Sequence, residues 1–303
     1  MISIEKYIQE VFGPFKAHLD SNVKLCSLKG VNYDLKNLPD YSDIHIQEYY
    51  LLRYAFAYTF EYKQMFLSAL QKIPWYNPNP TLKILSIGCG NGLDYWSAVN
   101  AVMHKGLSSK IEYHGIDIID WKYRFCKREN DEMSIEICNA VEYFKTNSEL
   151  NCNIIFFPKS IGEFSIESFN YICDSIKKIK FTSRSIRLLV SIRSTYSHTR
   201  TDMGRVASIV KALEENKVKR FIALDNCLSP YETLENMGIR AFDKDFTYPE
   251  NAKEFLLELD KMCVSYKTNG RSCQGCESSR LTRHPILLTN KVAFKRINLK
   301  EDR

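Results

Sequence analysis

The first eighty residues show apolar positions at helical spacing. The segment from Asp43 to about Lys72 contains neither glycine nor proline, and its apolar residues recur about every three to four positions. Pro74 and the Asn-Pro pairs at 77–80 cannot continue a helix, so they end it and form a stiff connector. We therefore expect residues 1–79 to be a helical N-terminal extension or cap.

After residue 80, short apolar runs alternate with amphipathic segments of helical length. This alternation predicts a parallel sheet covered by helices on both faces, with ligands bound at the carboxyl ends of the strands. A last apolar run closes the sheet. The expected strands are 82–87, 111–116, 134–138, 153–157, 185–192, 220–224 and 291–297, and the expected helices are 93–104, 165–178, 203–215 and 251–262.

Residues 226–285 interrupt this order. The stretch is rich in polar residues, cysteines and glycine, and only 251–262 has a clear helical pattern. We therefore expect one α/β domain over residues 80–303, in which 226–285 form a cysteine-containing insertion before the last strand.

Composition narrows the class of protein. Of 303 residues, 45% are hydrophobic and 26% are charged, which excludes a disordered chain. No apolar run reaches the ~18 residues of a membrane span, and the N-terminus lacks the apolar stretch of a signal peptide. We expect a soluble, cytoplasmic protein that needs no membrane, whose ten cysteines are reduced or metal-bound.

The net charge of +6 is concentrated in two stretches. Residues 177–220 hold twelve basic and three acidic residues, and residues 260–303 hold ten basic and four acidic residues. The two stretches either form a face for RNA or another phosphate-bearing partner, or are an ordinary solvated surface.

One segment carries the most chemical information. The run Lys83-Ile-Leu-Ser-Ile-Gly-Cys-Gly-Asn-Gly-Leu-Asp94 leads a buried strand through three glycines into a helix. Glycines there allow a sharp turn and a close approach to a ligand, and the helix N-terminus offers free N–H groups. A dinucleotide-binding loop would need its third glycine at position 93, which is leucine, and a Walker loop would need Gly-Lys-Ser/Thr, which is absent.

Three later positions extend the pattern, because each follows a successive strand. Asp117 ends the second strand, Asn139-Ala140 follows the third, and Phe157 ends the fourth. Together with the G-x-G-x-G loop, residues 80–225 resemble the class I S-adenosylmethionine-dependent methyltransferase superfamily. The resemblance implies a Rossmann-like fold that binds S-adenosylmethionine through Gly88, Cys89, Gly90, Gly92, Asp117, Ile118, Asn139, Ala140 and Phe157.

The resemblance also assigns roles. Asp117 would accept both ribose hydroxyls, Asn139 and Ala140 would read the adenine amino group, and Phe157 would lie beside the methyl group. Ser86 departs from the pattern, because many relatives carry an acid in the first strand. What organises the methionine end of the cofactor is therefore open.

The helix before the first strand offers further candidates. Tyr50, Tyr54 and Tyr58 share one helix face, with Arg53 beside them. In the superfamily such a helix often covers the methionine moiety, so Arg53 would pair with its carboxylate and Tyr54 would donate a hydrogen bond. The alternative is that the tyrosines are half-buried packing residues.

The methyl acceptor is harder to predict, because methyl transfer needs few diagnostic side chains. Lys159, Glu163 and His198 are the candidate catalytic residues, since loops after the fourth and fifth strands place them at the mouth of the site. Each is otherwise an exposed loop residue. The loop after the fourth strand lacks the pattern of DNA amino-methylating enzymes, and the chain has no Pro-Cys pair for cytosine C5 methylation. RNA, protein and small-molecule acceptors stay open.

A cysteine cluster lies within the insertion. Cys263, Cys273, Cys276 and His284 include one C-x2-C pair, and four such ligands complete a tetrahedral zinc site. The alternative is free thiols in a basic loop.

Two other classes of function remain as alternatives. A catalytically silent relative would bind nucleic acid through the basic stretches, with steep salt dependence and no cofactor. An NAD-dependent enzyme would use the same kind of sheet, but the glycine spacing disfavours it.

Overall fold

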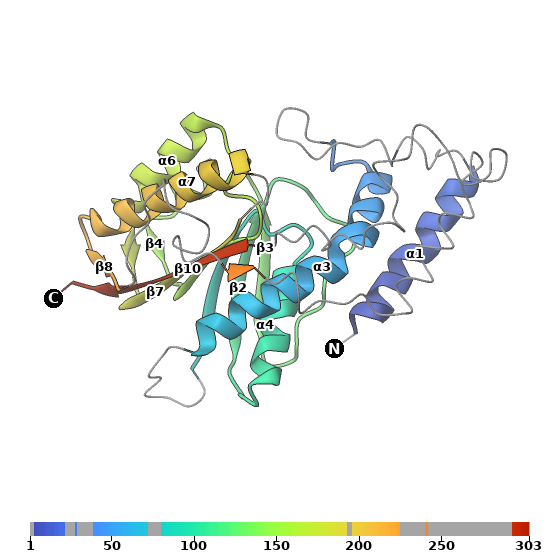
Figure 1. The fold of residues 1–303 in the computed structure, drawn as a ribbon, viewed down its shortest axis with the longest axis horizontal. Coiled ribbons are helices and arrows are strands. Elements are labelled where there is room, and N and C mark those ends of the chain that lie inside the picture. The colour runs from blue at the N-terminus through green and yellow to red at the C-terminus, as the bar shows by residue number, and fades with distance from the viewer. Residues whose placement is uncertain are drawn as a thin grey trace. The chain divides into compact units, whose positions relative to one another are not determined.

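The computed structural model describes residues 3–21, 28, 39–71, 80–192, 196–224, 240–241 and 293–302 (Figure 1). The described residues form two compact units. The helical unit contains those up to Tyr58 together with Trp121–Arg124, and the sheet unit contains the others. The predicted boundary at 79/80 stays a prediction. So does the predicted insertion at 226–285, because most of it lies outside the described residues.

The helical unit is built on α1 (Ile4–Ser21) and the first part of α3 (Ile44–Gln71). Each helix buries an apolar stripe, and the rings of Phe15 and Tyr49 stack with their centroids 6.5 Å apart. The segment Trp121–Arg124 is fastened to α3, because the amide oxygen of Gln47 accepts a hydrogen bond from the Lys122 N–H at 3.0 Å.

The sheet unit has a mixed sheet at its centre, in the order β3-β2-β1-β5-β7-β10-β8, with β9 paired to β10. The pairs from β3 to β7 are parallel, and β10 runs antiparallel to β7, β8 and β9. A small second sheet pairs β4 with β6. The strands are β1 (Leu82–Ile87), β2 (Ile111–Asp117), β3 (Glu132–Ile137), β4 (Glu149–Leu150), β5 (Ile154–Phe157), β6 (Lys180–Phe181), β7 (Ser185–Ile192), β8 (Phe221–Ala223), β9 (Arg240–Ala241) and β10 (Ala293–Glu301).

Helices cover both faces of this sheet, as the sequence predicts. One face carries α5 (Ala140–Thr146), α6 (Ile166–Ile176) and α7 (Tyr196–Glu214), and Figure 1 shows α6 and α7 side by side. The other face carries α4 (Leu93–His104), whose Tyr95 packs on Tyr113 of β2, and the second part of α3, whose Tyr62 and Phe66 pack on Phe156 of β5.

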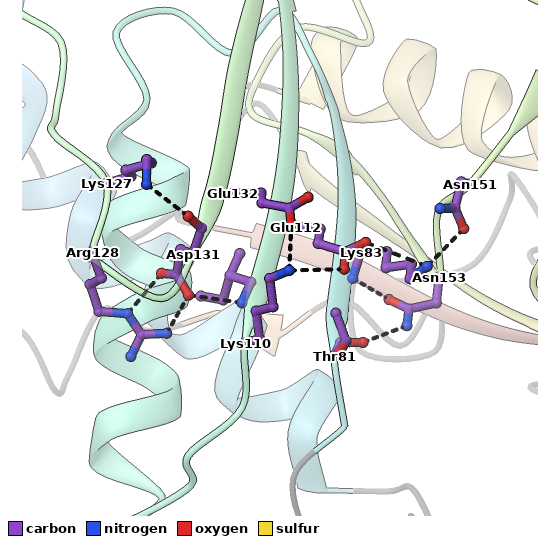
Figure 2. Close-up of polar contacts among 11 residues, drawn as sticks. Thr81, Lys83, Lys110, Glu112, Lys127, Arg128, Asp131, Glu132, Asn151 and Asn153 are labelled. Carbon is purple, nitrogen blue, oxygen red and sulfur yellow. Dashed lines mark hydrogen bonds and ion pairs between the residues drawn. The ribbon is translucent and has the colours of Figure 1, made fainter.

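A polar network holds the amino-terminal ends of the strands (Figure 2). The Asn153 side chain accepts a hydrogen bond from the Lys83 N–H at 2.9 Å and donates one to the Thr81 carbonyl at 2.9 Å, so it bridges β1 and β5. Asp131 does the same for β2 and β3, since it accepts from the Ile111 N–H at 2.9 Å and pairs with the Arg128 guanidinium. These contacts fix the register at the edge opposite to the carboxyl ends.

The structure adds one feature and corrects one local prediction. The last strand, β10, for which the apolar pattern predicts no direction, runs antiparallel to β7 and β8. Apolar patterning carries no information on strand direction once the strand–helix alternation has broken down. The helix expected from Met203 begins at Tyr196, since its polar first turns resemble a loop in sequence. His198 therefore lies in α7 and not in a loop.

Candidate active site

The strand register brings the ends of four strands to one level. Ser86 pairs with Gly115 on one side and with Phe156 on the other, and Phe156 pairs with Leu189. The residues that follow these positions are therefore neighbours at the carboxyl edge. Asp117, the glycine loop and the loop after β5 meet there, as the sequence predicts, and Ser191 of β7 lies at the same edge.

The glycine loop has a backbone that other residues adopt only at a cost. Gly88, Gly90 and Gly92 have φ angles of +74°, +58° and +86°, all in the left-handed region. At Gly88 space is also lacking, because an added Cβ would lie 2.4 Å from Cβ of Ser160. Gly92 is the N-cap of α4 and brings no side chain to the helix N-terminus. The N–H groups of Gly88, Cys89, Gly90 and Gly92 all donate hydrogen bonds within the protein, to the Ile116 carbonyl, the Asp117 carboxylate and the Cys89 carbonyl. The loop is therefore held firmly to β2, and its glycines let a ligand approach the backbone closely.

Asp117 fastens this loop to β2. Its Oδ2 accepts a hydrogen bond from the Gly90 N–H at 2.7 Å, and its Oδ1 accepts one from the Ile119 N–H at 2.9 Å. Each carboxylate oxygen has a second lone pair, so the group can still accept hydrogen bonds from a diol. The side chain is held in place by the loop it stands beside, and no helix follows Asp117 for it to cap.

The remaining predicted cofactor residues of the sheet unit lie along the same edge. Cys89 is buried, Ile118 is exposed, and Phe157 is buried at the end of β5. Asn139 is the N-cap of α5, and its side-chain oxygen accepts from the Val141 N–H at 2.8 Å, which leaves the amide NH2 as the part of this side chain that can donate to a ligand. Ala140 follows it and is buried.

A buried acid missed by the sequence analysis lies behind the loop. Asp94, in the first turn of α4, accepts hydrogen bonds from the Tyr113 hydroxyl at 2.8 and 2.9 Å. Burial raises its pKa to about 6, although the Ser86 and Tyr113 hydroxyls act to lower it. Asp94 therefore places a carboxyl group next to Ser86, the position where many relatives of the resembled superfamily carry an acid. The acidic residue directly after the glycine motif was the available signal.

A second missed residue is Glu61 of α3, which is fully buried. Its Oε1 lies 2.9 Å from Nζ of Lys159 and accepts a hydrogen bond from the Ser191 hydroxyl. Burial raises the pKa of Glu61, and Lys159 and Ser191 oppose that rise. The helix pattern around Glu61 gave no signal that this acid faces the sheet.

Lys159 itself has an unusual backbone. Among the residues that the structure describes, Lys159 is the one non-glycine residue with a positive φ, which is 66°. Its Nζ also donates to the Ile192 carbonyl at 3.1 Å, so the side chain crosses from the end of β5 to the end of β7. Such a conformation costs energy and is most often found at functional sites.

The loop after β5 is shaped by α7. The Arg205 guanidinium donates to the Ile161 carbonyl at 2.6 Å and to the Phe164 carbonyl at 2.7 Å. Glu163 lies between them and is exposed, in a loop as expected. The guanidinium of Arg205 is thus engaged with the protein backbone.

Arg53 and Tyr54 belong to the helical unit. The predicted common face of the tyrosines is confirmed, since the ring centroids of Tyr50 and Tyr54 are 4.9 Å apart and those of Tyr54 and Tyr58 are 5.1 Å apart. The Arg53 guanidinium lies over the Tyr54 ring at 5.3 Å. Their contact with a cofactor stays a prediction.

The predicted zinc ligands Cys263, Cys273, Cys276 and His284 lie outside the described residues, as does the side chain of His198. Zinc at the cysteine cluster and a catalytic role for His198 are therefore still predictions.

Much of the basic charge in 177–220 is compensated. Five of its side chains lie within 4.0 Å of a carboxylate, and Arg187 is buried, which lowers its pKa to about 10. The paired residues are Lys177, Lys180, Arg184, Lys211 and Arg220. An ordinary solvated surface, the second reading of this stretch, fits these contacts.

A hollow of about 310 Å³ lies on the sheet, lined by residues of β1, β2, β3 and α5 that include Glu112, His114 and Tyr143. Neither the glycine loop nor Asp117 lines it. The candidate active site is therefore defined by the strand ends and not by this hollow.

No protein-family model and no curated protein matches the sequence. Solved structures with similarity include a phosphoethanolamine N-methyltransferase 2 from Haemonchus contortus in complex with phosphomonomethylethanolamine and S-adenosylhomocysteine, at 13% identity and a TM-score of 0.36 over 84% of this chain and 60% of that one. A methyltransferase from Archaeoglobus fulgidus that depends on S-adenosylmethionine has 14% identity and a TM-score of 0.35 over 82% and 99%. A geranyl diphosphate C-methyltransferase from Streptomyces coelicolor has 11% identity and a TM-score of 0.37 over 98% of both chains.

The assignment of the fold rests on the sheet itself. The mostly parallel order β3-β2-β1-β5-β7-β10-β8, with one antiparallel strand and helices on both faces, is the Rossmann-like fold of the class I methyltransferases. Among the described helices, none combines the length and the apolar character that crossing a bilayer requires.

Proposed function

We propose that this chain is an S-adenosylmethionine-dependent methyltransferase. The observation that carries the proposal is the hydrogen bond between the Gly90 N–H and the Asp117 carboxylate. It joins a loop of three left-handed glycines to an acceptor-only side chain at the end of the next strand. This arrangement places a carboxylate, which only accepts hydrogen bonds, beside a loop without bulky side chains, which suits a nucleoside with an intact ribose that approaches the backbone closely.

The residues present fit the cofactor. Gly88, Gly90 and Gly92 would approach it through the backbone, Asp117 would accept the ribose hydroxyls, and the NH2 and backbone of Asn139 would bind the base. When bound, the cofactor would supply an electrophilic methyl group on a sulfonium for the lone pair of an acceptor, with S-adenosylhomocysteine as the leaving group. The protein's part is to align the acceptor and to exclude water, so its main contribution is positioning.

The acceptor side is formed by the loop after β5 and the start of α7. We propose that Lys159 shapes the floor of the acceptor pocket and that Glu163 and His198 bind the acceptor or take its proton. Glu61 balances the charge of Lys159, so this ammonium group adds little net charge for a phosphate-bearing acceptor. RNA, protein and small molecules remain the acceptor classes to be screened, in the cytoplasm where we expect the protein to act.

The test is calorimetric titration of the purified protein with S-adenosylmethionine, S-adenosylhomocysteine and NAD. We expect micromolar binding of the first two and none of NAD. Asp117→Ala should weaken binding at least tenfold, because it removes the ribose acceptor and releases the glycine loop. Asp120→Ala is the matched control, since Asp120 is an exposed acid three residues further along the same segment.

The opposite result is equally informative. Binding of NAD alone would favour a dehydrogenase. Binding of none of the three, together with salt-dependent binding of RNA, would favour a catalytically silent nucleic-acid-binding protein.

A further inference from the structure

Two histidines and a glutamate converge within the helical unit. His18 lies in the last turn of α1, and His45 and Glu48 lie one turn apart on α3, so they share a face of that helix. Nδ1 of His18 is 2.9 Å from Oε2 of Glu48, and Nδ1 of His45 is 3.9 Å from the same oxygen. One ligand atom from each residue lies within 4.8 Å of the other two.

The carboxylate is buried and its orientation is fixed. The Glu48 side chain is 0% exposed. Its second oxygen, Oε1, accepts a hydrogen bond from the Tyr123 hydroxyl at 2.7 Å, and the Tyr123 carbonyl accepts one from the Tyr7 hydroxyl at 2.8 Å. Outer hydrogen bonds of this kind orient ligands in metal centres, because they fix which oxygen faces the ion.

Hydrogen bonding alone does not account for His45. Its Nδ1 is buried and makes no hydrogen bond, yet it points toward the oxygen that His18 already contacts. The two imidazole rings meet edge to face with their centroids 4.8 Å apart. A tetrahedral ion with bonds of about 2.0–2.1 Å spaces its ligand atoms roughly 3.3 Å apart, which falls between the two distances to Oε2.

We propose that His18, His45 and Glu48 bind one divalent ion of the zinc class. Two imidazole nitrogens and one carboxylate oxygen are a ligand set that Zn²⁺ and Fe²⁺ accept, with a further position for water or another ligand. The ion takes the place of the proton between Nδ1 of His18 and Glu48, and in the neutral imidazole this proton moves to Nε2, so that His18 binds the ion as a neutral ligand. None of these ligands belongs to the predicted cysteine cluster, and the proposal does not depend on the proposed methyltransferase activity.

The experiment measures Zn²⁺ and Co²⁺ bound per chain after loading and removal of excess metal. His18→Gln and His45→Gln each remove one imidazole ligand but keep a polar side chain. His104→Gln is the control, because His104 is exposed at the end of α4. We expect each of the first two variants to lose one equivalent of metal relative to the wild type and His104→Gln.

The cysteine cluster is separated by a second variant, Cys273→Ser with Cys276→Ser. We expect this variant to retain the histidine-dependent equivalent, with Co²⁺ absorption that lacks thiolate charge-transfer bands. Glu48→Gln keeps an acceptor for Tyr123 and serves if an imidazole variant does not fold. Undiminished metal in folded His18→Gln, His45→Gln and Glu48→Gln would overturn the proposal, as would loss of all metal in the cysteine variant.

Discussion

At the scale of single residues, the site is built from groups whose conformation or charge has a cost. Lys159 has a left-handed backbone, Glu61 and Asp94 are buried acids, and Gly88 has no room for a side chain. Such features persist because neighbouring contacts hold them in place. The contribution of each of these residues can be tested by a substitution, with a control residue that differs from it in burial or in the space around it.

Gly88→Ala should cost about 3 kcal/mol of unfolding free energy, from backbone strain and overpacking against Ser160. Gly106→Ala is the matched control, because Gly106 has a similar φ of +64° but nothing within 4 Å of an added Cβ. The control should cost about 1 kcal/mol. Urea unfolding of both variants measures the difference, and equal losses would show that Gly88 is required only for its backbone angle.

Asp94 should make the protein less stable as pH rises from 4 to 6. Its pKa is about 6 in the folded protein and about 3.9 when unfolded, so the folded state holds the proton over this range. The stability contributed by the protonated acid is present below pH 4 and is lost by about 3 kcal/mol as pH passes 6. Asp94→Asn should flatten this part of the pH profile, measured by urea unfolding. Asp120→Asn is the control, because Asp120 is an exposed acid, and it should keep the pH profile of the wild type. If Asp94→Asn also kept that profile, Asp94 would already be ionised at pH 4 and the prediction would be wrong.

At the scale of elements, side chains join helices to the ends of strands. Glu61 links α3 to β5 and β7, and Arg205 links α7 to the loop after β5. Because a buried charge is costly without its partner, these links respond strongly to single substitutions and weakly to paired ones.

Lys159→Met should cost about 4 kcal/mol, because Glu61 loses its ionic partner and must either stay charged or take up a proton while buried. The double variant Lys159→Met with Glu61→Gln should cost clearly less than Lys159→Met alone, since no buried charge remains and Gln can still accept from Ser191. A double-mutant cycle by chemical denaturation gives the coupling, expected at about 2–3 kcal/mol. Additive losses would mean that the pair is not formed in solution.

Arg205→Ala should free the loop at 161–164. Two charge-assisted hydrogen bonds are lost, so amide exchange in this loop should become roughly tenfold faster while cofactor affinity changes little. Lys211→Ala lies on the same helix with a side chain 73% exposed, and it should have no effect. Hydrogen-exchange mass spectrometry compares the two variants. Unchanged protection of the loop in Arg205→Ala would show that Arg205 does not hold it in place.

At the scale of the whole molecule, the pairing of basic side chains with carboxylates affects how strongly the protein can bind nucleic acid. The described basic side chains of 177–220 are largely paired with carboxylates or engaged with backbone. We expect a generic 20-nucleotide RNA to bind no more tightly than non-specific binding, about 10⁻⁵ M at physiological salt. Fluorescence anisotropy at two salt concentrations checks this. A submicromolar affinity would contradict the prediction and favour RNA as the methyl acceptor.

The sequence predicts the sheet better than it predicts the site. Bounds such as 82–87, 93–104 and 185–192 agree with the structure, because buried strands and a capped helix have strong local patterns. Asp117 and the glycines were found because they follow strands directly. Glu61 and Asp94 were not, since their partners lie on other elements of the fold: Lys159 and Ser191 for Glu61, and Tyr113 of β2 for Asp94. The direction of β10 could not be predicted for the same reason, because strand pairing is not a local property.

The position of β10 also constrains how the protein is made. Among the strands that the structure describes, β8 pairs only with β10, which begins roughly seventy residues later in the chain. At ~5–20 residues per second, translation leaves β8 and the free edge of β7 without that partner for several seconds. Strands β1, β2, β3, β5 and β7 can pair during that time, so the edge that carries the loop after β5 can form first. Synthesis of β10 then completes the sheet, and a ribosome stalled within the preceding segment would hold a nascent chain with an open, apolar strand edge.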